Sequence, residues 1–140
     1  MIFLTKVSLL FCSICLISLS GRAEDKNEKT IAPISDFAPE GTELFKYQKR
    51  LYNFVGSKWK TKVSSNSLMI NKNEKVIFHF TVRPTGEITN IELVHGDPQS
   101  LLALMSLDSI KQSSEVFEFS DELLRESPNG FKWELSFKIY

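Results

Sequence analysis

The segment from position 131 to position 139 restricts the fold of this chain more than any other. Apolar and polar residues alternate along it without a break, and Asn129-Gly130 precedes it as a turn. Successive side chains of a β-strand point to opposite faces, so this pattern predicts a strand with one face in a core and one in water. The apolar positions are Phe131, Trp133, Leu135, Phe137 and Ile139, and the polar positions are Lys132, Glu134, Ser136 and Lys138.

A second alternating segment predicts a β-hairpin. The apolar residues Val76, Phe78, Phe80 and Val82 alternate with Ile77, His79, Thr81 and Arg83, and Pro84-Thr85-Gly86 follows with the residue types of a tight turn. The return strand is expected over 87–95. The clean alternation breaks between Ile88 and Ile91, which predicts a bulge near Thr89–Asn90.

The bulge sets the expected pairing of the two hairpin strands. Beyond it, Phe80 is expected to face Ile91 and Phe78 to face Leu93. His79 is then expected to stand opposite Glu92 on the other face, as a cross-strand surface pair.

Two segments have the apolar spacing of amphipathic helices. The first is expected over 42–63, with Thr42 as its cap. The second is expected to start at Asp97-Pro98 and to fade near 112–114. Asp121–Glu126 is expected to form a short helical turn. The apolar stripe expected on the second helix consists of Ala103, Leu104, Leu107 and Ile110, with Leu101 and Met105 beside it.

The order of these elements predicts an α+β fold. We expect a small three-stranded antiparallel sheet with two helices packed on one face. Apolar residues make up 42% of the chain and charged residues 24%, which is ordinary usage for a globular domain. Trp59 and Trp133 are expected to pack in the core rather than to form a ligand platform.

The first 41 residues are expected to lie outside the folded domain. Residues 1–23 have a positive start, an apolar run over 7–19 and Gly21-Arg22-Ala23, the pattern of a cleaved secretory signal peptide. The alternative is an uncleaved membrane anchor. Residues 24–41 are charged and contain Pro33 and Pro39, which is typical of a flexible linker, and residues 42–140 are expected to form the domain.

Several classes of function are disfavoured by what the sequence contains. Lys plus Arg and Asp plus Glu each number 17, so the basic excess of a nucleic-acid-binding domain is missing. Both cysteines, Cys12 and Cys15, lie inside the apolar run, and the two histidines are too few for a zinc site. No catalytic or phosphate-binding motif is recognisable. We expect no enzyme activity, no metal and no cofactor.

Three segments together resemble one protein family. They are Tyr47-x-x-x-Leu51-Tyr52-x-x-Val55-Gly56-x-x-Trp59, the hairpin from Val76 to Ile88, and the closing Leu135-Ser136-Phe137-Lys138-Ile139-Tyr140. This arrangement resembles the TonB C-terminal domain family, which is also similar to the TolA C-terminal domain. Gln48 stands where that family has proline, and the long proline-rich spacer is missing.

The resemblance implies an exported periplasmic protein-binding module. It would capture an extended partner segment by strand addition at the last strand, through Lys132, Glu134, Ser136, Lys138 and Tyr140. The implied partner is an envelope protein, either an outer-membrane transporter or an inner-membrane motor complex, and a homodimer is also allowed. The alternative is a TonB-type energy transducer anchored in the inner membrane, which requires residues 1–23 to be retained. Lys132 and Lys138 either prevent random edge pairing or attract an acidic partner.

Overall fold

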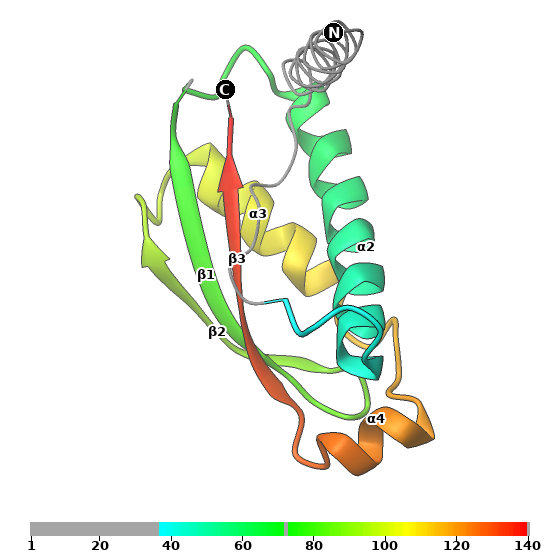
Figure 1. Ribbon diagram of the computed structural model, residues 1–140. Coiled ribbons are helices and arrows are strands. Elements are labelled where there is room, and N and C mark those ends of the chain that lie inside the picture. The colour runs from blue at the N-terminus through cyan, green and yellow to red at the C-terminus, as the bar shows by residue number, and fades with distance from the viewer. Residues whose placement is uncertain (1–36, 72, 140) are drawn as a thin grey trace, which may run out of the picture.

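The computed structural model describes residues 37–71 and 73–139, which form an α+β fold (Figure 1). The sequence expected as a signal peptide, and the linker up to position 36, lie outside the described residues. Along the chain, the elements are helix α2 (Glu43–Ser65), strand β1 (Lys75–Val82), strand β2 (Ile88–His95), helix α3 (Leu101–Gln112), helix α4 (Asp121–Glu126) and strand β3 (Phe131–Lys138).

The three strands form one antiparallel sheet in the order β2-β1-β3, so β1 is the central strand. Helices α2 and α3 lie on the same face of this sheet, and α4 lies at the end where the hairpin turns (Figure 1). Within the described residues no helix covers the opposite face. The predicted fold class, a three-stranded antiparallel sheet with two helices on one face, is therefore confirmed.

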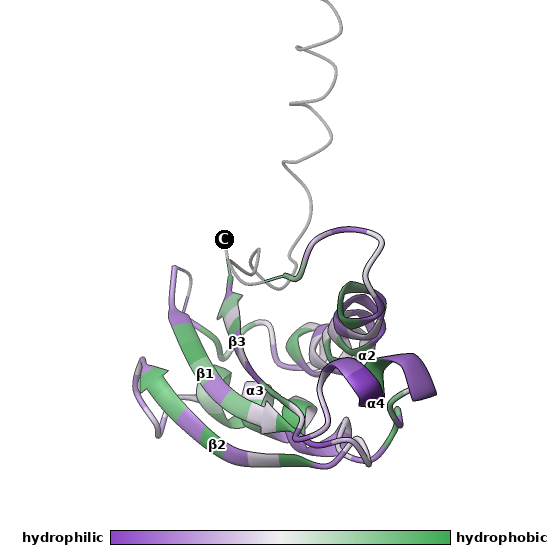
Figure 2. Cartoon of the chain, turned by 60° about the horizontal axis from the view of Figure 1, so that its bottom comes forward, coloured by the Kyte–Doolittle hydropathy of each residue, from purple (hydrophilic) through white to green (hydrophobic). Residues whose placement is uncertain are grey.

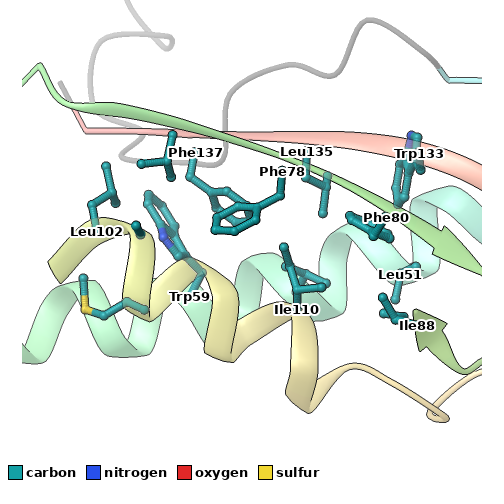
Figure 3. Close-up of a cluster of buried hydrophobic side chains, with 14 of the residues drawn as sticks. Leu51, Trp59, Phe78, Phe80, Ile88, Leu102, Ile110, Trp133, Leu135 and Phe137 are labelled. Carbon is teal, nitrogen blue, oxygen red and sulfur yellow. The ribbon is translucent and has the colours of Figure 1, made fainter. Parts of the chain in front are cut away.

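The core lies between the sheet and the two long helices, as Figure 3 shows. Side chains of β1 and β3 alternate between this core and the open face, and hydrophobic and hydrophilic residues alternate visibly along β1 in Figure 2. Trp59 and Trp133 are 0% and 3% exposed, so both tryptophans are core residues as expected. The strand residues in the core are Val76, Phe78, Phe80, Val82, Ile88, Trp133, Leu135 and Phe137.

Helix α2 begins where the sequence predicts. The side-chain oxygen of Thr42 accepts a hydrogen bond from the backbone N–H of Phe45 at 3.2 Å, so Thr42 is the N-cap. Glu43 adds a negative charge in the first turn, where it stabilises the positive end of the helix dipole.

Helix α3 begins later than predicted, and Ser100 rather than Asp97 is its cap. The side chain of Asp97 accepts from the N–H of Gln99 at 2.9 Å, which makes a local turn around Pro98. The hydroxyl of Ser100 then accepts from the N–H of Ala103 at 3.1 Å, and the helix starts at Leu101. The prediction was wrong because Asp-Pro forms a turn as readily as a cap.

The buried face of α3 also differs from the predicted stripe. Leu104 is 52% exposed and Leu107 is only half-buried, whereas Leu102, Ser106 and Ser109 are buried. Both serine hydroxyls are hydrogen-bonded: Ser106 accepts from the indole N–H of Trp59 on α2 at 3.0 Å, and Ser109 donates to the carbonyl of Met105, one turn earlier, at 2.8 Å. Periodicity of apolar residues alone could not reveal a contact face that contains serine.

The hairpin contains the predicted bulge and a second one. Asn90 has a φ of 54° and the register shifts between His79 and Thr81, so the bulge near Thr89–Asn90 is confirmed. Phe78 pairs with Leu93 and His79 with Glu92, as expected. Phe80 falls at the shift and has no register partner on β2, so its expected pairing with Ile91 is wrong. The unpredicted bulge lies between the pairs Ile77–His95 and Phe78–Leu93.

Tyr47 ties α2 to the loop that precedes α4. Its side chain is 4% exposed, and its hydroxyl donates to the backbone carbonyl of Phe117 at 2.6 Å. Burial raises the pKa of Tyr47 to about 12, and the nearby charge of Arg50 opposes that shift.

This raised pKa predicts a loss of stability in strong base. The unfolded chain releases the Tyr47 proton near pH 10, whereas the folded chain holds it to about pH 12. The stabilisation is therefore complete below pH 10 and is lost as the pH rises to 12. Allowing for solvent screening of a partly buried hydroxyl, we expect a loss of about 1–2 kcal/mol. Denaturant unfolding of the wild type and of Tyr47→Phe at pH 8, 10 and 12 measures this loss in the free energy of unfolding.

The phenylalanine variant is the control, because it keeps the ring and lacks the ionisable group. Its unfolding free energy should fall less than that of the wild type between pH 10 and 12. Parallel pH profiles for the two proteins would contradict the assignment to Tyr47.

Candidate functional site

Strand β3 lies at one edge of the sheet, and its outer side is the candidate binding edge. All eight residues of β3 pair with β1 in one register, from Lys75–Lys138 to Val82–Phe131, without a shift. No other strand in 37–71 or 73–139 pairs with the outer side of β3. Strand β2, at the other edge, carries two register shifts within eight residues. Bulges disrupt edge pairing, so β3 is the better template for an added strand.

The backbone hydrogen bonds show which groups of β3 point outward. The N–H of Arg83, directly after β1, donates to the carbonyl of Glu87 at 2.9 Å, so odd-numbered residues of β1 face β2. Even-numbered residues of β1 therefore face β3, where their register partners are odd-numbered. It follows that the N–H and C=O groups of Lys132, Glu134 and Ser136 point away from the sheet.

The predicted site residues differ in their surroundings. Lys132 is exposed, Glu134 and Lys138 are half-buried, and Ser136 is buried with 9% of its surface exposed. All four side chains lie on the face of the sheet opposite the helices, as their alternation predicts. Tyr140 lies outside the described residues.

His79 makes a contact that the sequence pattern did not indicate. Its Nε2 lies 2.6 Å from a carboxylate oxygen of Glu134, and both side chains are partly exposed. Glu92 is the register partner of His79 on β2, as expected, but Glu134 is its register partner on β3. A residue on a central strand has two cross-strand neighbours, and the hairpin pattern revealed only one.

A hollow of about 540 Å³ opens on the face of the sheet opposite the helices. All three strands line it: His79 and Thr81 from β1, Asn90 and Glu92 from β2, and Lys132 and Glu134 from β3. Its lining contains both signs of charge, so it suits polar side chains of a segment lying along β3. Among the described residues, no three His, Cys, Asp or Glu side chains are grouped so that they could hold a metal ion.

A cluster of aromatic rings lies on the helix side of β3, and we call it the aromatic groove. It consists of Phe45 and Tyr52 from α2 and Trp133 from β3. The ring of Phe37 lies among these three, at centroid distances of 5.8, 5.7 and 5.7 Å respectively. All three contacts are edge-to-face, the arrangement that aromatic pairs favour. Sequence patterning missed this groove because Phe37 falls in the segment expected as a linker.

Two polar features accompany the aromatic groove. The ammonium of Lys49 lies 5.5 Å from the ring centre of Phe37 and 5.9 Å from that of Tyr52. The indole N–H of Trp133 is buried, and none of the described residues accepts a hydrogen bond from it. In Figure 3 its nitrogen lies on the strand side of the ring, turned away from α2 and α3. A buried donor without an acceptor is uncommon and marks a place where an acceptor fits.

None of the helices in the described ranges is both long and apolar enough to cross a lipid bilayer. No protein-family model matches the chain. No curated protein matches it. Among solved structures, the chain is similar to the NMR solution structure of a TonB-CTD from Helicobacter pylori, residues 179–285. The two are 18% identical, with a TM-score of 0.37 over 71% of this chain and 94% of that chain.

Proposed function

We propose that this chain is a protein-binding module that captures an extended segment of a partner by adding it to the outer edge of β3. The observation that carries the proposal is the unbroken register of β3, combined with the outward direction of the backbone groups of Lys132, Glu134 and Ser136. An incoming strand satisfies such groups with main-chain hydrogen bonds, and neighbouring pockets select its side chains.

The surroundings of β3 offer a different environment to each of the two sets of side chains of a captured strand. Alternate side chains of a captured strand point to opposite faces of the sheet. One set would lie beside the polar hollow on the open face, and the other beside the aromatic groove on the helix face. The partner segment is therefore expected to alternate polar and aromatic or apolar residues.

The setting of this function is part of the proposal. The resemblance of the three sequence segments to TonB C-terminal domains supports a periplasmic location and an envelope protein as partner, either an outer-membrane transporter or an inner-membrane motor complex. The non-enzymatic role follows from the same resemblance. Recovery of the protein in the membrane fraction with residues 1–23 intact would instead favour the anchored energy transducer.

Strand addition makes a testable prediction about Lys132. Proline at this position removes only an N–H that faces outward, a change that edge strands tolerate. We expect Lys132→Pro to fold and to lose at least about tenfold in affinity for captured peptides, since it removes one edge hydrogen bond and disturbs its neighbours. The matched control, Lys132→Ala, keeps the N–H and should bind within about threefold of the wild type. The probes are 12-residue peptides selected from a random display library against the full chain.

The same peptides allow a second measurement from the partner's side. Methylation of the peptide backbone nitrogens, one at a time, should abolish binding at every second position, because only alternate amides of an added strand face β3. Hydrogen exchange should slow at Lys132, Glu134 and Ser136. Binding that tolerates methylation at every position, or protection confined to 91–93 of β2, would overturn the proposal.

A further inference from the structure

The aromatic groove already has an occupant that comes from the chain itself. The described chain starts at Phe37 beside β3 and crosses to the start of α2 (Figure 1). One hydrogen bond, from the N–H of Ala38 to the side-chain oxygen of Gln48 at 2.8 Å, holds the backbone next to the ring. No backbone–backbone hydrogen bond joins residues 37–41 to β3 within the described part of the chain.

Phe37, the occupant of the groove, does not provide a hydrogen-bond acceptor for every buried donor there. Phe37 fills the aromatic part through its contacts with Phe45, Tyr52 and Trp133, but it supplies no acceptor to the indole N–H of Trp133. A buried N–H without a partner is unfavourable, and an acceptor placed there removes that penalty. An extended backbone beside β3 carries a carbonyl at every residue, so a captured strand is the kind of ligand that offers one.

The occupant also indicates what kind of partner the groove accepts. An aromatic ring fits between Tyr52 and Trp133, and the ammonium of Lys49 lies near the ring faces. A cation at this place favours a partner segment with a carboxylate close to its aromatic residue. In the chain's own sequence, Asp36 directly precedes Phe37.

We propose that Phe37 is a built-in competitor for the partner site: it occupies the aromatic groove until an extended partner segment with an aromatic residue displaces it. This inference rests on the proposed capture of a strand at β3 and adds its regulation. A tethered occupant competes at high effective concentration, so it lowers the apparent affinity for a free partner in proportion to the fraction of time that the groove is filled.

The test uses the full chain and a peptide copied from it. The probe is a fluorescent peptide of residues 34–41, Ile-Ser-Asp-Phe-Ala-Pro-Glu-Gly. Fluorescence anisotropy should show that Phe37→Ala binds this probe at least about tenfold more tightly than the wild type, because its groove is empty. Phe37→Leu should lie between the two. A probe with alanine in place of its phenylalanine should not bind either protein.

Phe54 provides a matched control. It is a half-buried phenylalanine with an edge-to-face contact to Phe117 and the ammonium of Lys58 5.3 Å from its ring centre, so its surroundings parallel those of Phe37. Phe54→Ala should bind the probe as weakly as the wild type. In NMR spectra, the indole N–H signal of Trp133 should shift when the probe binds Phe37→Ala, while that of Trp59 should stay in place.

The outcomes separate this inference from the proposed function. Equal affinity of the wild type and Phe37→Ala for the probe, or no binding of the probe to a folded Phe37→Ala, overturns self-occupation. If the display-selected peptides still protect β3 in that case, strand capture stands without the competitor. If the probe binds Phe37→Ala tightly but no peptide protects β3, occupation of the groove by Phe37 stands, but strand capture fails and there is no partner for Phe37 to compete with.

Discussion

Replacement of Trp133 by alanine is expected to lower the free energy of unfolding by about 3–5 kcal/mol, the range for removing a large buried aromatic side chain. Trp133 is 3% exposed, and its ring contacts those of Phe37, Phe80 and Phe131 at centroid distances of 5.7–6.2 Å. Its removal leaves a cavity that these neighbours can fill only in part. Urea unfolding followed by circular dichroism measures the loss, and a loss below about 1 kcal/mol would mean that Trp133 does not pack in the core.

Phenylalanine substitutions at the two tryptophans provide the control for this prediction. Trp133→Phe keeps a ring and removes an N–H that has no partner within 37–71 and 73–139, so it should cost less than about 1.5 kcal/mol. Trp59→Phe removes the hydrogen bond to Ser106 as well as the larger ring, and should cost about 1–3 kcal/mol more than Trp133→Phe. The reverse order would show that the indole N–H of Trp133 is satisfied in solution.

The second large effect is expected at Gly130, the residue that turns the chain into β3. Its φ is +82°, and a Cβ there would overlap the carbonyl oxygen of Val82 and lie 3.0 Å from the Cα of Arg83. Alanine therefore meets both the strain of the left-handed region and a backbone clash that only a shift of β3 relieves. We expect Gly130→Ala to lower the unfolding free energy by about 2–4 kcal/mol.

Alanine at Gly41 measures the cost of the left-handed conformation without the backbone clash that is present at Gly130. Its φ is +87°, close to that of Gly130, but a Cβ there would meet nothing within 4 Å. Gly41→Ala should therefore cost only about 1 kcal/mol, the usual penalty of the left-handed conformation. Equal losses for the two variants in the same urea experiment would show that the contact with Val82 contributes nothing to the effect at Gly130.

Local rules were sufficient for the elements of this fold except the start of α3. Alternation over 131–139 and 76–83 predicts which side chains face the core, because successive side chains of a strand point to opposite faces, and both strands are where the pattern predicts them. The cap at Thr42 and the bulge at Asn90 are equally local, since each depends on the residue type and its near neighbours. The three-stranded sheet with its helices on one face followed from the order of those elements.

The features that sequence patterning missed depend on contacts between distant segments. The buried face of α3 includes Ser106 because Trp59, 47 positions away, supplies a donor to its hydroxyl. His79 contacts Glu134, 55 positions away, because β3 lies beside β1. Phe37 occupies the aromatic groove beside Trp133, and no periodic pattern links a residue among prolines and charges to a ring in the last strand. The candidate edge could be anticipated from a resemblance, whereas the groove beside it could not.

The contrast between the irregular β2 and the regular β3 has a consequence for stoichiometry. A sheet that accepts new strands on both flanks grows into a filament, because each added molecule presents a fresh template. Under the proposed capture of a strand at β3, the two register shifts of β2 leave one flank per molecule for an added strand. One guest strand, or one second copy related by a two-fold axis, saturates it. We therefore expect complexes of this chain to contain two components and to grow no further, even at the high local concentrations of a crowded compartment.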